Sequence, residues 1–254
     1  MRYFALVYCG FLLGLQAEVP SGDLSQAHAA LDRGDPAAAV SIAEQVLSRD
    51  ADNVPAWIIL GHGLSEEIDQ AGILRKAALA KRCLAAYLKA VSLQPRNVEA
   101  HTSLVEFYRR APTVVGGSRD KAYAEAKLLL GIDAGQGYSL LTSLQAEEGK
   151  FDEAFATCEE LQRLEPDTYR ALFRLGETCA SSERQLIRGL TAMKKAIVLT
   201  PGTDDPDLED GFVVLGRLLE KSGARAAAVA AYERAIQLNP KLQEARERLK
   251  RLNP

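Results

Sequence analysis

The sequence predicts an all-α protein made of repeated helical hairpins, and three recurring patterns predict it. Glycine followed five residues later by alanine opens an amphipathic run at Gly34, Gly149 and Gly223. Prolines follow the apolar runs at similar places: Pro95, Pro166, Pro201 and Pro240. A leucine recurs in the segment before each run: Leu60, Leu104, Leu141, Leu175 and Leu215.

Each hairpin is expected to pair a first helix that carries the leucine with a second helix that stops before the proline. Proline ends a helix because it lacks an N–H group and clashes with the preceding turn. Three of the leucines are followed directly by Gly61, Gly176 and Gly216, and small residues let a neighbouring helix approach. A single hairpin cannot bury its apolar face, so the hairpins must stack on one another.

Two sets of equivalent positions in the second helices, called columns here, predict how neighbouring helices pack. The first column holds a small residue in every unit and permits helix axes to approach to about 8–10 Å: Ala39, Cys83, Ala122, Ala154, Gly189 and Ala228. The other column is expected to fill the space between units: Ala43, Tyr87, Ala126, Cys158, Met193 and Tyr232.

The segments Trp57–Gly61, Gly149–Ala154 and Ala235–Pro240 resemble the tetratricopeptide repeat signature. The long Ala-Pro…Gly-Gly turn is similar to one in exported bacterial proteins of that family whose function is uncharacterised. The resemblance implies a right-handed α-solenoid of six hairpins with the first helices along a concave face. It places a polar capping helix at residues 243–252, which shields the last repeat from water. The implied units lie near residues 20–53, 54–97, 98–134, 135–168, 169–208 and 209–242.

The N-terminal residues predict an export signal. Arg2 precedes the apolar run Tyr3–Leu15, and a permissive small-residue cleavage site ends at Ala17. The run has about 13 residues, fewer than the roughly 20 that a helix needs to cross the hydrocarbon core. A cleaved signal peptide at residues 1–17 is therefore expected, followed by a solenoid at residues 18–254 without an integral membrane span. The periplasm is the expected location.

The charge of the chain argues against nucleic acid as a partner. The formal net charge is −3, from 31 basic and 34 acidic side chains. Removal of residues 1–17 takes away Arg2 and no acid, which leaves 30 basic and 34 acidic side chains, or −4. Such a surface repels a phosphate backbone, since affinity there depends on clustered lysine and arginine. We expect a protein or peptide partner and no cofactor.

The stretch Ala111–Ala122, APTVVGGSRDKA, is expected to be an expanded turn between two helices. A longer loop costs only about a few tenths of a kcal/mol. A phosphate-binding loop would need a preceding strand and a Gly-Lys-Ser/Thr ending, and neither is present. The alternative is an anion site at the following helix, formed by the N–H groups of Gly117 and Ser118 with Arg119 and Lys121.

The second repeat holds about ten extra residues against the usual 34-residue period. Its composition from Ile73 onward favours helix, so the second helix should protrude by about two turns. Ile73 and Leu74 at the tip form either an exposed docking point or a contact with Val114 or Val115 of the long turn.

The cysteines are expected to have structural roles. Cys83, Cys158 and Cys179 fall in packing columns, where a free thiol behaves as a small hydrophobe. In an oxidising compartment three thiols allow one intramolecular disulfide, and Cys158 with Cys179 is the expected pair.

A row of His28, His62 and Glu106 occupies equivalent inward positions of the first three repeats. The row raises the alternative of a metal- or pH-responsive binding protein. Adjacent first helices should lie about 8–10 Å apart, however, whereas zinc ligands lie about 2 Å from the metal. No His-Glu-x-x-His motif and no Ser-His-Asp order is legible. We therefore expect a solvated groove, with no metal and no catalytic residues.

Seven residues one helical face away from the packing columns form the candidate partner-binding site: Arg109, Arg110, Arg170, Phe173, Arg174, Val213 and Arg217. Arginine presents planar donors that suit carboxylates, and Phe173 or Val213 could receive an apolar side chain, so an extended peptide or an acidic tail fits. The alternative is that the arginines pair with Glu106, Glu177 and Glu220 on a solvated face.

The sequence therefore predicts a non-enzymatic scaffold that binds a protein or peptide partner through a concave groove. One alternative is a structural subunit of an envelope or secretion assembly that uses the convex face. The other is a metal- or pH-responsive binding protein that uses the histidine row. An enzyme would need a cleft that the repeats do not supply.

Overall fold

The structure is a computed structural model that describes residues 21–203 and 205–252, without the side chains of residues 21–23, 73 and 74. The predicted signal peptide, residues 1–17, lies outside the described residues and stays a prediction. The same holds for the side chains of Ile73 and Leu74, whose docking role is not described.

Thirteen α-helices and one short 3₁₀ turn make up the regular structure of the described chain. The first helices of the hairpins are α1 (Ser21–Asp32), α3 (Val54–Gln70), α5 (Val98–Arg110), α7 (Ala134–Glu147), α9 (Tyr169–Ser182) and α11 (Leu208–Lys221). The second helices are α2 (Pro36–Arg49), α4 (Ile73–Leu93), α6 (Arg119–Leu129), α8 (Phe151–Leu164), α10 (Leu186–Ala196) and α12 (Arg225–Leu238). The 3₁₀ turn η1 (Thr113–Val115) lies between α5 and α6, and α13 (Gln243–Leu252) follows the last hairpin.

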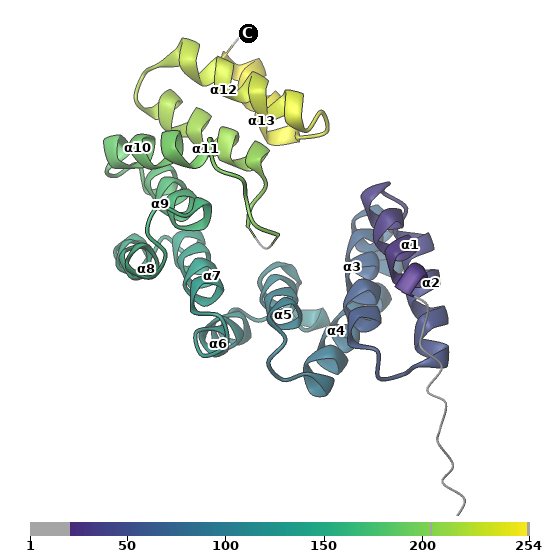
Figure 1. The fold of residues 1–254 in the computed structure, drawn as a ribbon. Helices are drawn as coiled ribbons and strands as arrows, with labels where there is room; N and C mark the ends of the chain where they lie inside the picture. The colour runs from purple at the N-terminus through teal and green to yellow at the C-terminus, as the bar shows by residue number, and fades with distance from the viewer. Residues whose placement is uncertain (1–20, 204, 253–254) are drawn as a thin grey trace, which may run out of the picture.

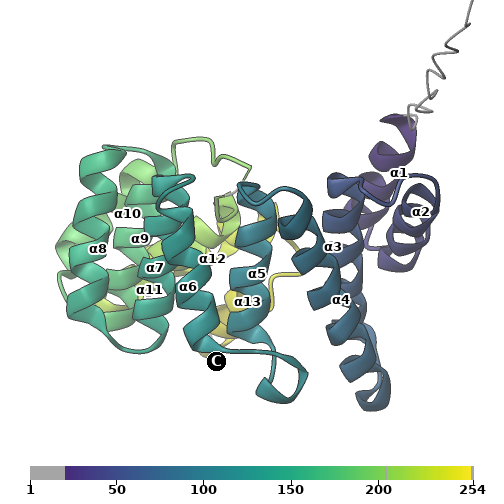
Figure 2. The ribbon, with the colours of Figure 1, turned by 90° about the horizontal axis from the view of Figure 1, so that it is seen from below.

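The hairpins stack into a curved solenoid (Figure 1). Helices α5, α7, α9 and α11 follow the inside of the curve, and their hairpin partners lie outside them. A view from below shows the hairpins side by side along the curve (Figure 2). The predicted fold class, an all-α solenoid of helical hairpins with a closing helix, is confirmed.

Side chains that precede the first helices explain where these helices begin. Asn53, Asn97, Asp133 and Thr168 each accept a hydrogen bond from the backbone N–H three residues later. These caps satisfy donors that have no partner inside the helix.

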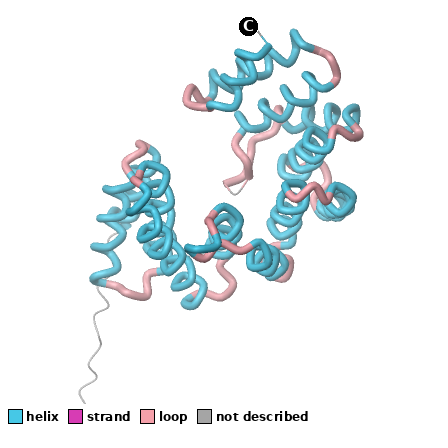
Figure 3. Tube along the Cα trace, turned by 180° about the vertical axis from the view of Figure 1, so that it is seen from behind, coloured by secondary structure: helices cyan, strands magenta, loops and turns pink. Residues whose placement is uncertain are grey.

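The prolines mark the ends of most second helices, as predicted. Helices α4, α8 and α12 end two residues before Pro95, Pro166 and Pro240. Helix α10 ends at Ala196, five residues before its proline, which leaves a long connection to α11. This connection is described at residues 197–203 and 205–207 and is called here the 197–207 segment. This segment reaches into the hollow of the solenoid (Figure 3).

The two predicted packing columns of the second helices are both buried. Where the space-filling column carries a large side chain, that side chain lies against a glycine of the first helix. A Cβ built on Gly61 would lie 2.6 Å from Cδ1 of Tyr87, and one on Gly216 would lie 2.7 Å from Cδ1 of Tyr232. Close helix approach therefore depends on glycine at these positions.

Helix α4 is longer than the other second helices, as the insertion predicts. It has 21 residues against 14 in α2, which is about two extra turns at the helical rise. The turn after α5 packs on α4, since Val115 is buried and Gly116 lies against Leu84. Val114 points away from the core, with 85% of its surface exposed.

The predicted disulfide is absent, because Cys158 and Cys179 are both free, buried thiols. The sulfur of Cys158 lies 3.5 Å from the hydroxyl of Thr178, and Cys179 packs against the backbone of Gly189. The prediction was wrong because each thiol packs against a different residue of a neighbouring helix.

Candidate functional site

A cavity of about 270 Å³ lies on the inside of the solenoid and is called here the α9–α11 cavity. Its lining includes five of the seven predicted partner-binding residues: Arg109, Phe173, Arg174, Val213 and Arg217. The helical periodicity of α5, α9 and α11 brings these side chains to one face.

Most of the arginines in this cavity are engaged by carboxylates of the chain itself. Arg109 pairs with Glu106 and with Glu147. Arg174 donates to Glu177 at 2.8 Å. These contacts match two of the three pairings that the alternative reading of the sequence names. The third carboxylate, Glu220, instead lies 3.4 Å from Arg248.

Arg217 is placed differently from these arginines. Its Nη2 atom donates to the hydroxyl of Ser181 at 3.1 Å. The described residues show no ion pair for Arg217. Near it, burial and then the carboxylates of Asp207 and Glu209 raise the pKa of Asp210 to about 6.

Phe173 and Val213 line the cavity but belong mainly to the core. Phe173 is 3% exposed and Val213 is 4% exposed. Arg174 lies over the ring of Phe173, with 5.4 Å between the guanidinium carbon and the ring centroid. The two apolar side chains therefore expose only a little surface to a partner.

Arg110 and Arg170 do not join this cavity. Arg170 contacts the 197–207 segment instead, where its Nε donates to Asp205 at 2.7 Å. The hydroxyl of Tyr169 donates to the backbone carbonyl of Asp207 at 2.9 Å. These two residues of α9 hold the segment in the hollow.

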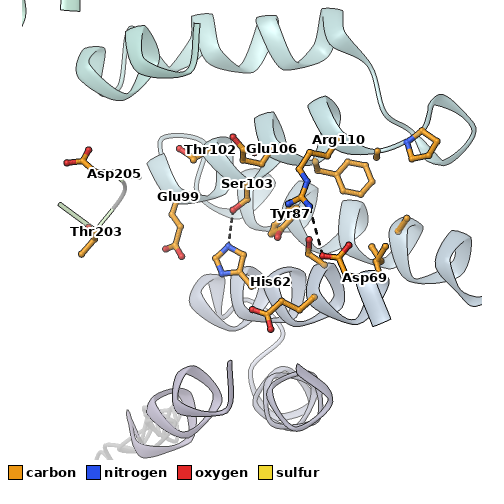
Figure 4. Close-up of a pocket in the computed structure, with 17 residues that line it drawn as sticks. His62, Asp69, Tyr87, Glu99, Thr102, Ser103, Glu106, Arg110, Thr203 and Asp205 are labelled. Atoms are coloured by element: carbon orange, nitrogen blue, oxygen red, sulfur yellow. Dashed lines mark hydrogen bonds and ion pairs between the residues drawn. The ribbon is translucent and has the colours of Figure 1, made fainter. Parts of the chain in front are cut away.

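A larger cavity, of about 590 Å³, lies between α3 and α5 and is called here the α3–α5 cavity (Figure 4). His62 and Arg110 line it together with Tyr87 of α4 and with Thr203 and Asp205 of the 197–207 segment. The sequence pattern did not predict this cavity, because its far wall comes from a segment about 100 residues away along the chain.

Glu106 lines both cavities, so they meet on α5. The α3–α5 cavity and the α9–α11 cavity together are called the concave groove.

The histidine row is only partly assembled. Nε2 of His62 hydrogen-bonds with the hydroxyl of Ser103 at 3.1 Å (Figure 4). His62 and Glu106 line the α3–α5 cavity, whereas His28 is exposed outside it. Within the described residues, no group of three or more His, Cys, Asp or Glu side chains is placed to hold a metal ion.

Burial, and to a smaller degree the charge of His28, lowers the pKa of His62 to about 4. In the unfolded chain, His62 has the ordinary histidine pKa of about 6.5, so it binds a proton below that pH. Stability from neutral His62 is thus full above pH 6.5, and is lost as the pH falls to 4.

The free energy of unfolding of the wild-type chain should therefore fall between pH 7 and pH 4.5 more than that of His62→Gln. The difference should be about 2–3 kcal/mol at most, for a shift of that size. Urea unfolding followed by circular dichroism at both pH values measures it. Carboxylates with a raised pKa, such as Glu66, act in the opposite direction but equally in both proteins. Parallel pH curves would show that His62 does not titrate as described.

The alternative anion site in the long turn is wrong. The N–H of Gly117 donates to the carbonyl of Pro112 at 3.1 Å, and the N–H of Ser118 donates to the carbonyl of Tyr108 at 2.9 Å. Arg119 pairs with Glu147 at 2.8 Å. The backbone donors and Arg119 are thus used inside the protein, and Nζ of Lys121 lies 5.4 Å from the ring centroid of Tyr108.

The fold and the groove define the class of protein: an α-solenoid with a concave surface, a form that serves protein–protein interaction. A family model described as "Tetratricopeptide repeat" matches residues 24–62, and a second model with the same description matches residues 210–242. The chain therefore carries tetratricopeptide repeats at both ends of the solenoid.

Solved structures of similar fold agree with this result. PilW, described as a "widely conserved type IV pilus biogenesis factor", aligns over 89% of this chain and 96% of its own, with 16% identity and a TM-score of 0.59. PilF of Pseudomonas aeruginosa aligns over 89% and 94%, with 15% identity and a TM-score of 0.57. A tetratricopeptide repeat protein from Parabacteroides merdae aligns over 92% and 98%, with 14% identity and a TM-score of 0.56. No curated protein matches the sequence.

These identities show the shared fold, which is that of tetratricopeptide repeat proteins. None of the described helices is both long enough and apolar enough to span a membrane.

Proposed function

We propose that the chain is a non-enzymatic scaffold that holds an extended segment of a partner protein in its concave groove. The observation that carries the proposal is the pair of cavities, about 590 Å³ and 270 Å³, that meet at Glu106 on the inside of the curve. A solenoid provides an extended concave surface of this kind, and an extended peptide can follow it from one cavity to the next.

The chemistry of the groove supports binding rather than catalysis. His62 and Ser103 form a pair that resembles the start of a nucleophilic site, but a histidine with a pKa of about 4 is a weak base at neutral pH. Burial also raises the pKa of Cys179 to about 11 and that of Cys83 to about 12, which opposes formation of a reactive thiolate.

Export to the cell envelope is part of the proposal. It is supported by the N-terminal pattern of Arg2 and the apolar run Tyr3–Leu15, and by the likeness in fold to a pilus biogenesis factor. In the envelope the scaffold would hold a protein segment that belongs to a larger assembly.

A photo-crosslinking amino acid placed at single positions tests the use of the groove. Glu66 and Arg217 line its two cavities. Ile187 on the outer helix α10 and Leu128 on the outer helix α6 are matched controls, since they are 82% and 56% exposed. After irradiation in the native host, we expect adducts of defined mass from the two groove positions and none from the two controls.

The reverse pattern, with adducts from Ile187 or Leu128 alone, would favour the structural subunit that uses its convex face. Equal adducts from all four positions, or no adduct from the groove, would also overturn the proposal.

A further inference from the structure

Carboxylates outnumber guanidinium groups in the concave groove. The α3–α5 cavity is lined by five carboxylates and one guanidinium: Glu66, Asp69, Glu99, Glu106, Asp205 and Arg110. His62 is neutral, so the formal charge of this lining is −4, which the pairs of Glu106 with Arg109 and of Asp205 with Arg170 reduce to −2. The α9–α11 cavity adds Glu177, Asp210 and Glu244 to Glu106, against three arginines. A cleft lined by one sign of charge focuses its field on an incoming ligand.

The arginines near the groove are shared among more carboxylates than they can neutralise. Arg170 lies 2.7 Å from Asp205 and also 3.6 Å from Glu165 and 3.9 Å from Asp133. Arg110 lies 4.0 Å from Asp69, and both side chains are well exposed, so this pair is weak. The groove therefore offers a partner little positive charge beyond Arg110 and Arg217.

Carboxylates lie on two sides of the α3–α5 cavity, and the one on the 197–207 side, Asp205, is paired with Arg170. Asp205 of the 197–207 segment lies on the side of the cavity away from Asp69, with Glu99 between them (Figure 4). At the other end, burial and the nearby carboxylates Asp69 and Asp32 raise the pKa of Glu66. A bound cation would offset both the burial and the repulsion, because it favours the charged carboxylate.

The cavity also has apolar surface beneath the carboxylates. Ile68, Tyr87 and Phe107 contribute to its lining. Lysine and arginine combine an apolar stem with a charged head, so the stem can lie on apolar surface while the head reaches carboxylates. This combination distinguishes a basic side chain from an acidic or purely apolar one.

We propose that the concave groove takes a cationic segment of the partner protein, with lysine or arginine side chains in the α3–α5 cavity between α3, α5 and the 197–207 segment. This inference rests on the proposed use of the groove and names the chemistry of its partner. It replaces the expectation of an acidic tail, because the arginines that would bind such a tail are mostly engaged by the chain itself.

Two labelled peptides serve as probes: one of alternating lysine and serine, and its counterpart with glutamate in place of each lysine. Fluorescence anisotropy with the full chain should show binding of the lysine peptide at least about tenfold tighter than that of the glutamate peptide. The double variant Glu66→Gln with Asp69→Asn should weaken the lysine peptide by about tenfold, since each partly exposed ion pair contributes modestly.

The matched control is Glu153→Gln with Glu233→Gln, which removes the same charge from exposed positions of α8 and α12. Its affinity for the lysine peptide should equal that of the wild-type chain. Equal loss in both double variants, equal or tighter binding of the glutamate peptide, or binding of neither peptide would overturn the cationic partner. Those results would not exclude binding of a partner in the groove. The crosslinking experiment tests such binding separately, because its adducts do not depend on the charge of the partner.

Discussion

Gly216→Val is expected to lower the free energy of unfolding by about 3 kcal/mol or more, because the added side chain has no space. A Cβ at Gly216 would overlap Cε1 of Tyr232 and lie 2.7 and 2.8 Å from two further ring atoms. The ring cannot move aside, since Tyr232 is fully buried and its hydroxyl donates to Glu220 at 2.8 Å. Urea unfolding followed by circular dichroism measures the loss.

A double-mutant cycle shows whether this contact is the cause. Tyr232→Ala alone should also destabilise, by about 3–5 kcal/mol as for other large-to-small core changes. Gly216→Val combined with Tyr232→Ala should lose clearly less than the sum of the two single variants, because the valine then fills the space left by the ring. Strict additivity would show that the valine is rejected by something other than Tyr232.

The smaller loss expected for the double variant follows from a pattern that the sequence already contains. Gly61, Gly176 and Gly216 lie against Tyr87, Met193 and Tyr232. The equivalent first-helix positions in repeats three and four hold Val105 and Thr142, and the second-helix column there holds the small residues Ala126 and Cys158. Large and small residues thus alternate between the two helices of a hairpin. The fold could be predicted from sequence because this packing is local to each repeat.

The electrostatics of the groove could be predicted only where the partners are close in sequence. The pairs of Arg109 with Glu106 and of Arg174 with Glu177 join residues three apart, which helix geometry brings together. The pair of Arg170 with Asp205 joins residues 35 apart. Its formation depends on the path of the 197–207 segment, for which no periodicity gives a signal.

The α3–α5 cavity escaped prediction for the same reason. Helices α3 and α5 can be recognised in the repeat pattern. The wall that carries Asp205, however, comes to lie beside them only when the whole curved solenoid has formed. In the structure, the early end of α10, five residues before Pro201, distinguishes this connection from the others. The partner chemistry of the groove is therefore a property of the assembled solenoid rather than of any single repeat.

Gly117→Ala is expected to be more damaging than its size suggests, with a loss of about 3 kcal/mol or more in the free energy of unfolding. A Cβ at Gly117 would overlap the carbonyl oxygen of Ala111 and lie 2.5 Å from its carbonyl carbon. Backbone atoms cannot rotate away as a side chain can. Relief would require breaking the hydrogen bond from the N–H of Gly117 to Pro112, which closes the turn after α5.

Gly131→Ala is the matched control for this turn, because its nearest contact would be an ordinary 3.6 Å to the carbonyl oxygen of Leu128. Its effect should stay within about 0.5 kcal/mol, as for most surface substitutions. Urea unfolding of both variants makes the comparison. If Gly117→Ala were as mild as the control, the tight turn could not be what fixes the start of α6. The internal use of its N–H groups, which excludes the anion site, would then be wrong as well.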